Sequence, residues 1–209
     1  EIISHAWHVA MSGHPGPVVL ALPEDIFRQV ADVPPAPIVR VATPAPPPPV
    51  MQGLEGQLHY AKRPMMILGG SRWSQHSAAA AQVFAAKHDL PVAVTFRRQG
   101  LFDHEHPNYA GDLGIGPNPK LKARIEESDL LIVVGARLSE MPSQGFTLLN
   151  FPKPQIQLVH VHPGPEELGR IYRPDIAINS TPGEFFGAAE SFKPRKGDGA
   201  SEVAHADYL

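Results

Sequence analysis

The run from Asp129 to Leu138 constrains the fold more than any other part of the chain. Its five aliphatic residues at 130–134 are typical of a strand buried on both faces, as in a parallel sheet covered by helices. Ligands of such sheets bind beyond the carboxyl ends of the strands. There Gly135 lets a ligand approach the backbone and Arg137 can bind a phosphate, which indicates an anion site. The alternative is that Gly135 only turns the chain and Arg137 pairs with a surface carboxylate.

On either side of this run, segments with the apolar pattern of a strand alternate with segments that have the periodicity of a helix. We predict strands at 65–68, 91–95, 130–134, 156–161 and 176–178, and helices at 50–61, 75–88, 120–127, 165–171 and 181–189. Residues 97–119 are expected to be irregular. Alternating strands and helices favour an α/β fold, a Rossmann-like doubly wound parallel sheet.

Proline divides the chain. Many of its 24 prolines lie between 34 and 49, which predicts a stiff, extended linker. A helix at 2–11 and a strand at 18–22 precede the linker and cannot bury their apolar faces alone. The expected domains are a remnant of a preceding domain at 1–32, the linker at 33–49, the Rossmann-like domain at 50–191, and a linker or disordered tail at 192–209.

Composition excludes several function classes. The net charge of −3 gives no electrostatic footprint for nucleic acid, and no apolar run reaches the ~20 residues that span a membrane. Without cysteine there is no disulfide, thiolate metal site or cysteine nucleophile. We therefore expect a cytoplasmic protein. A first residue, Glu1, that lies within a predicted helix suggests an excised fragment.

Two glycine clusters are candidate anion sites. Gly69 and Gly70 follow a predicted strand, where backbone N–H groups can hold an anion. The second cluster lies at 111–116 in the long irregular segment. The complete G-x-G-x-x-G fingerprint is absent and no acidic residue ends the next strand, which argues against a plain nicotinamide-dependent dehydrogenase.

Histidines and serines do not complete a catalytic or metal site. Two pairs of histidines have alternating spacing, His104 with His106 and His160 with His162. No carboxylate or cysteine set completes a coordination sphere around them. The Gly-x-Ser-x-Gly nucleophile motif is absent. We predict no catalytic residue and no metal site in this chain.

Several blocks in order resemble the thiamine-diphosphate-dependent enzymes of the acetolactate synthase, benzoylformate decarboxylase and pyruvate oxidase superfamily. The block at 12–25, Ser-Gly-His-Pro-Gly-Pro-Val-Val-Leu-Ala-Leu-Pro-Glu-Asp, resembles the end of that family's pyrimidine-binding domain. The blocks at 61–70, 90–92, 129–138 and 158–170 resemble its central domain.

The resemblance implies the middle third of a three-domain enzyme. The catalytic glutamate would precede Glu1, and the thiamine diphosphate and Mg²⁺ would bind in a following domain, so the fragment itself would be inactive. Gly197-Asp198-Gly199 matches only the start of the metal-diphosphate motif and lacks its downstream asparagines, so we treat the match as accidental. The full-length protein would act on a 2-keto acid as a transferase or lyase and would form homo-oligomers, with thiamine diphosphate as the electron sink.

The central domain of this family binds FAD in some members, ADP or a coenzyme A nucleotide in others, and no ligand in many. The resemblance implies nucleotide contacts at six positions: Gly69, Gly70, Gly114, Gly135, Ala136 and Arg137. Where flavin-binding relatives carry acidic residues, this chain has His162, Gly164 and Thr181. Acidic groups orient a ribose, so we expect FAD or ADP to be held poorly.

Three hypotheses therefore remain open. The chain is the non-catalytic central domain of a thiamine-diphosphate enzyme, a nucleotide-binding module for FAD, ADP or a coenzyme A nucleotide, or a structural spacer with an empty crevice. Partners are expected to be the other domains of the same polypeptide, without nucleic acid or membrane.

Overall fold

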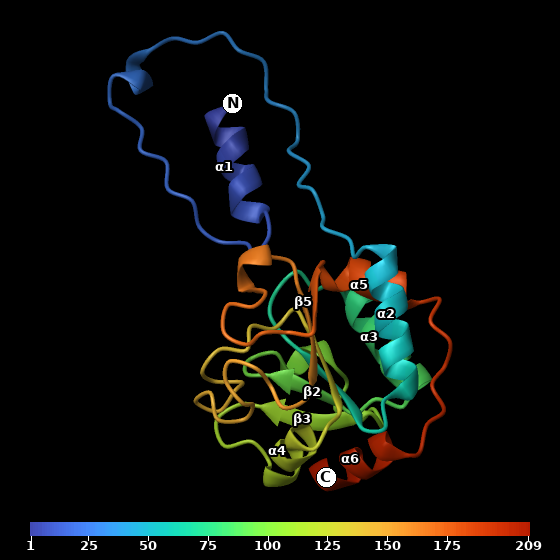
Figure 1. Ribbon diagram of the computed structural model, residues 1–209. Coiled ribbons are helices and arrows are strands. Elements are labelled where there is room, and N and C mark those ends of the chain that lie inside the picture. The colour runs from blue at the N-terminus through green and yellow to red at the C-terminus, as the bar shows by residue number, and fades with distance from the viewer.

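The computed structural model describes residues 1–209 and is built around one six-stranded sheet in which all strands are parallel. The sheet order is β3-β2-β1-β4-β5-β6 (Figure 1). Its strands are β1 (Pro64–Leu68), β2 (Val92–Thr95), β3 (Tyr109–Leu113), β4 (Leu130–Val134), β5 (Gln157–His162) and β6 (Ile176–Asn179). The expected α/β doubly wound sheet is confirmed, and its order reverses between β1 and β4.

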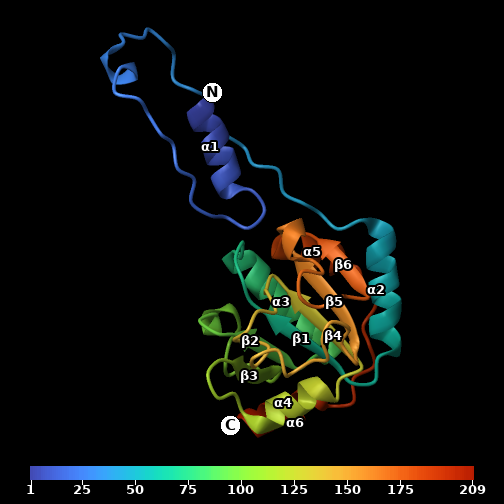
Figure 2. The same cartoon turned by 60° about the vertical axis from the view of Figure 1, so that its left-hand side comes forward.

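Helices cover both faces of the sheet, and one helix stands apart from it. The α-helices are α1 (Ile2–Met11), α2 (Pro48–Tyr60), α3 (Gln75–His88), α4 (Pro119–Glu126), α5 (Pro182–Ala189) and α6 (Ala200–Tyr208). Short 3₁₀ turns lie at Ile26–Arg28, Gln99–Leu101 and Pro165–Glu167. Figure 2 shows α1 and its following loop projecting from the domain, so the domain is formed by the chain from the end of the linker onward.

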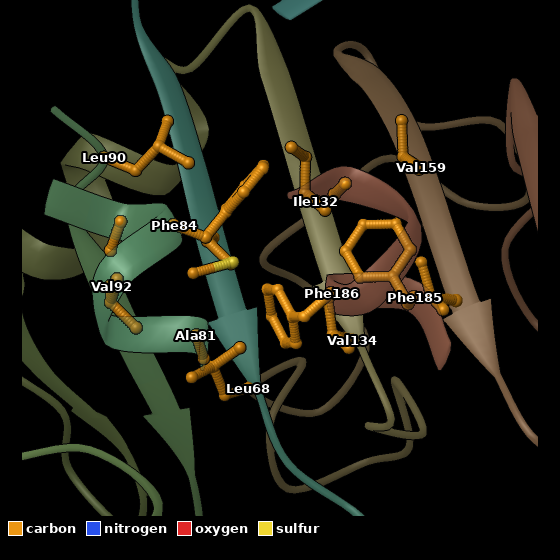
Figure 3. Packing of buried hydrophobic residues seen from close by; sticks show 14 of the residues in the cluster. Leu68, Ala81, Phe84, Leu90, Val92, Ile132, Val134, Val159, Phe185 and Phe186 are labelled. Atoms are coloured by element: carbon orange, nitrogen blue, oxygen red, sulfur yellow. The ribbon is translucent and has the colours of Figure 1, made fainter. Parts of the chain in front are cut away.

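The central strands are apolar throughout. Because successive side chains of a strand point to opposite faces of the sheet, these strands contribute to two hydrophobic cores, one on each face. In β1, Met66 and Leu68 join the core beneath α2, α3 and α5, whereas Met65 and Ile67 join the core beneath α4 and α6. Figure 3 shows the first core, where Phe84 of α3 and the Phe185–Phe186 pair of α5 pack on the strands. Both faces of each central strand are therefore buried.

Helix α3 has boundaries that its sequence specifies. Ser74 and Ser77 form a capping box in which each side chain accepts from the backbone N–H of the other. The helix ends where Asp89 adopts a left-handed conformation, with φ 49°. The predicted helix at 75–88 is confirmed to the residue. Its capped start fixes the position of the loop that follows β1.

Three predicted elements differ from the structure. Residues 18–22, predicted as a strand, form none and are exposed throughout. The predicted helix at 165–171 is only the 3₁₀ turn at 165–167. Strand β3 lies in the segment expected to be irregular, and its Gly111 has φ 119°, which few other residues adopt.

The end of the chain also differs from expectation. The tail expected to be a linker or disordered contains helix α6, whose Ala204 is buried beside α4 and β3. The Asp89 carboxylate accepts hydrogen bonds from the backbone N–H groups of Gly199 at 2.8 Å and Asp198 at 3.0 Å, and from Ser201. The Gly-Asp-Gly turn therefore binds a carboxylate of its own chain. The remaining domain boundaries stay predictions.

Candidate functional site

The carboxyl ends of β1 and β4 meet at the reversal of strand order, where the sequence predicted a site. Gly70 and Gly135 have positive φ values of 71° and 75°. A Cβ atom on Gly70 would overlap the carbonyl oxygen of Gly135, and a Cβ on Gly135 would lie 2.6 Å from the carbonyl oxygen of Gly69. A Cβ on Gly69 would overlap the Thr95 hydroxyl. Because these glycines have no side chains, the carboxyl ends of β1, β4 and β2 can approach one another.

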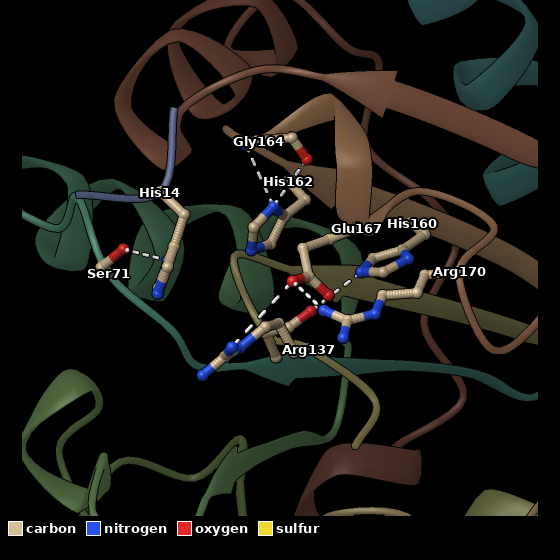
Figure 4. Close-up of polar contacts among 9 residues, drawn as sticks. His14, Ser71, Arg137, His160, His162, Gly164, Glu167 and Arg170 are labelled. Carbon is tan, nitrogen blue, oxygen red and sulfur yellow. Dashed lines mark hydrogen bonds and ion pairs between the residues drawn. The ribbon is translucent and has the colours of Figure 1, made fainter. Parts of the chain in front are cut away.

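The two residues after Gly135 have different environments. Ala136 is buried, and its carbonyl oxygen lies 2.8 Å from Nε2 of His160. The side chain of Arg137 is half-exposed, with Nη1 4.0 Å from Oε1 of Glu167. That Glu167 oxygen also accepts a 2.8 Å hydrogen bond from Arg170 (Figure 4). The alternative prediction paired Arg137 with a surface carboxylate, whereas the carboxylate found near it, that of Glu167, is 9% exposed and makes its short contact with Arg170.

Gly114 lies in a neighbouring hollow rather than at the junction. Its carbonyl oxygen accepts a 3.2 Å hydrogen bond from Nε2 of Gln144. The hollow has a volume of about 670 Å³ and is also lined by Ile115, Glu140 and Met141. Of the six predicted contact residues, five therefore come together at the ends of β1 and β4, and Gly114 lies beside them.

In a smaller cleft beside the junction, Arg137 is joined by two further basic residues, His14 and Arg98, that were not among the predicted contacts. The volume of the cleft is about 220 Å³, and its lining residues are His14, Gly70, Thr95, Phe96, Arg98, Arg137, Ser139, Met141 and Pro142. Arg98 follows β2, whose carboxyl end shares the rim with β1, so the predicted strand at 91–95 contained the signal. His14 comes from the N-terminal segment, and no local pattern places it here.

The N-terminal segment touches the domain at this rim. Arg72 donates from Nη1 to the carbonyl oxygen of Met11 at 2.7 Å, and Nδ1 of His14 lies 3.3 Å from the Ser71 hydroxyl. A Cβ on Gly13 would lie 3.5 Å from Cα of Gly164. The segment 11–14 therefore covers the loops after β1 and β5.

Two buried histidines occupy the β5 end of the rim. Burial lowers the pKa of His160 to about 4, although the hydrogen bond to Ala136 opposes this shift. Burial also lowers the pKa of His162, against the effect of its contact with Gly164. Nδ1 of His162 lies 3.0 Å from the Gly164 nitrogen, whereas its Nε2 is buried and has no hydrogen-bond partner. Burial therefore favours the neutral form of both rings.

No three His, Cys, Asp or Glu side chains are grouped so that they could hold a metal ion. None of the helices combines the length and the apolar character that crossing a membrane requires.

A parallel sheet in this order, with glycines and an arginine where the order reverses, defines a doubly wound domain of the dinucleotide-binding type. The family model described as "Thiamine pyrophosphate enzyme, central domain" matches residues 53–188. The chain belongs to this family of central domains, as its sequence resemblance implied.

The chain is also similar in sequence to curated proteins. The chain is 30% identical over 185 residues to the acetolactate synthase isozyme 1 large subunit of Escherichia coli K12, covering 86% of this chain and 32% of the relative. It is 28% identical to glyoxylate carboligase of Escherichia coli O157:H7, covering 86% of this chain and 30% of the relative. The chain thus spans about a third of the length of these relatives.

The fold is also found in a solved structure. The crystal structure of benzoylformate decarboxylase from Polynucleobacter necessarius superposes with a TM-score of 0.72 at 22% identity. The match covers 94% of this chain and 36% of that protein. This likeness supports the fold alone.

Proposed function

We propose that this chain is the non-catalytic central domain of an enzyme that acts on 2-keto acids with thiamine diphosphate and Mg²⁺. The observation that carries the proposal is the family match over residues 53–188, together with relatives named as acetolactate synthases and a glyoxylate carboligase. The proposal includes a cytoplasmic homo-oligomer that forms or breaks a carbon–carbon bond next to a carbonyl group. Thiamine diphosphate would supply the electron sink for that reaction.

This chain's own residues do not provide a thiamine site. Gly197-Asp198-Gly199, the one segment that resembles part of a diphosphate motif, is folded around the Asp89 carboxylate. The contribution of this chain is then to hold the preceding domain, through segment 11–14, against a rigid sheet. The cofactor and the catalytic glutamate would come from other domains of the polypeptide.

The test is a screen of the full-length protein that contains this chain. Purified enzyme with thiamine diphosphate and Mg²⁺ would be offered pyruvate, 2-ketobutyrate, glyoxylate and benzoylformate, and both CO₂ release and carboligation products would be measured. We expect turnover of at least one 2-keto acid that is lost on removal of thiamine diphosphate. Turnover that does not depend on the cofactor, or a protein without the two flanking domains, would contradict the proposal.

As a second function, we propose that the crevice at the ends of β1 and β4 holds an anionic group. The observation in favour is the convergence of Arg98, Arg137 and His14 on one cleft. Arg137 would be the main contact, with Gly69, Gly70, Gly135 and Ala136 shaping the wall and Gly114 beside it. Phosphate is expected to raise the melting temperature above that in chloride at equal ionic strength, and Arg137→Ala is expected to remove the difference. An equal difference in Arg137→Ala would remove Arg137 from the site.

A further inference from the structure

Strand β5 does not end in the acidic residue that orients a nucleotide ribose. In domains of this type an acidic residue accepts hydrogen bonds from the ribose hydroxyls. Here His160 and His162 end the strand, and burial lowers the pKa of each. His160 is engaged with the Ala136 carbonyl, and no carboxylate lines the cleft. A carboxylate does lie just beyond β5, that of Glu167, but it already holds Arg170 at 2.8 Å and lies 4.0 Å from Arg137. A ribose diol would therefore compete with these arginines for its charged acceptor.

Space is also limited along the path of a dinucleotide. Gly70 and Gly135 pack against each other, so there is no space at the Cβ position of either residue. On the β5 side, Gly13 lies against Gly164 and closes the rim. The cleft between the two arginines has a volume of about 220 Å³, below the about 300–1,000 Å³ typical of pockets for drug-sized ligands. At Ser139 and Met141 it adjoins the hollow of about 670 Å³.

The charges that line the cleft favour a small anion. Arg98, Arg137 and His14 line it, whereas the larger hollow beside it has Glu140 and no cation. Glu167 contacts Arg137 only at 4.0 Å and holds Arg170 at 2.8 Å, which leaves donors of Arg137 available. Figure 4 shows the unpartnered Nε2 of His162 directed into the space between His14 and Arg137.

We propose that this crevice takes a compact phosphate or pyrophosphate anion between Arg98, Arg137 and His14 in preference to flavin or another dinucleotide. The proposal rests on the second proposed function and names its ligand class. The segment 11–14 forms part of the wall, so anion binding also fixes the preceding segment to the sheet. Charge-assisted hydrogen bonds from the two guanidinium groups would provide most of the affinity.

Calorimetric titration of the 209-residue chain with inorganic pyrophosphate, FAD, ADP and coenzyme A tests the proposal. We expect saturable binding of pyrophosphate that Arg137→Gln weakens by about tenfold or more. Arg98→Gln and His14→Ala should each weaken binding to a smaller degree. The matched control is Arg63→Gln, an exposed arginine at the other end of β1, which should leave the affinity unchanged.

Absence of pyrophosphate binding would overturn the proposal. So would FAD, ADP or coenzyme A binding more tightly than pyrophosphate with sensitivity to Arg137→Gln. Circular dichroism of each variant separates lost binding from lost folding, and His14→Ala provides a second reading because His14 lies outside the sheet. Cofactor-dependent turnover of 2-keto acids by the full-length enzyme would persist if only this proposal failed, so the two failures are distinguishable.

Discussion

At the scale of single residues, the junction of β1 and β4 depends on the absence of side chains. Gly70 has a φ of 71°, and a Cβ there would overlap the Gly135 carbonyl oxygen. Because backbone atoms cannot rotate away as a flexible side chain would, the two strand ends must separate to accept even a methyl group. The glycines identified as candidate ligand contacts are thus first of all packing residues.

Gly70→Ala is expected to lower the free energy of unfolding by about 2–4 kcal/mol, since left-handed strain and overpacking add. Gly53→Ala in helix α2 is the matched control, because a Cβ there meets nothing within 4 Å. It should instead raise the free energy of unfolding by about 0.5–1 kcal/mol. Urea denaturation measures both. Equal stability of Gly70→Ala and the parent would contradict the packing role.

His88 makes stability sensitive to acid. It is buried against Phe84 and Phe192, both ring nitrogens lack partners, and burial lowers its pKa to about 4. The unfolded chain therefore binds this proton more readily than the folded one. The contribution is fully present above pH 6.5 and is lost as the pH falls through about 4.

His88→Leu should accordingly flatten the fall of unfolding free energy between pH 6.5 and 4, by roughly 2–3 kcal/mol over that interval. His59→Leu, at an exposed position, is the control and should retain the parent's slope. Denaturation at a series of pH values supplies the measurement. A parent-like slope in His88→Leu would mean that another group carries the acid response.

At the scale of elements, helix α6 is held by a residue distant in sequence. Burial alone would raise the pKa of Asp89, but hydrogen bonds from Ser201, Gly199 and Asp198 lower it below its usual range. The carboxylate thus stabilises the start of α6 as an N-cap does, although it belongs to the end of α3.

Asparagine has the shape of aspartate and also tolerates a left-handed backbone, so Asp89→Asn removes only the negative charge of the side chain. We expect hydrogen exchange of the amides in α6 to accelerate, corresponding to about 1–2 kcal/mol of lost local stability. The amides of β1 and β4 should keep their protection. Asp25→Asn, in the exposed N-terminal loop, provides the control. Unchanged exchange in α6 would show that Tyr208 and Ala204 suffice to hold the helix.

Elements with local signals could be predicted, and those that depend on distant contacts could not. The aliphatic run of β4 and the serine cap of α3 specify their own boundaries. Strand β3 contains Gly111 and Asp112, which disfavour strands, and forms because β2 lies beside it. Helix α6 requires Asp89, and the cleft requires His14, which is brought in from another part of the chain. The position of Arg137 at the rim could be predicted, because only Gly135 and Ala136 separate it from a buried strand, whereas its role as a ligand contact stays a prediction.

At the scale of the whole molecule, both cores consist of residues from Met51 to Ala204. Segment 1–43 contributes the contacts of residues 11–14, and most of its large apolar side chains are exposed, such as Val19 at 91% exposure. A chain of residues 44–209 should therefore unfold cooperatively with a melting temperature within about 5 °C of the parent's. Calorimetry measures this. A broad transition would show that the N-terminal segment is part of the folding unit.

The position of β1 between β2 and β4 has a consequence for synthesis of the chain. Strand β1 is made first, yet one of its two neighbours is β4, about 60 residues later. On a ribosome adding about 5–20 residues per second, one edge of the nascent sheet stays unpaired for about 3–12 s. Ribosome-bound chains halted before Leu130 should be cut rapidly by protease, and those extended past His162 should resist it. During that interval, chaperones or rapid synthesis must keep the unpaired edge of the nascent sheet from pairing with the wrong strand.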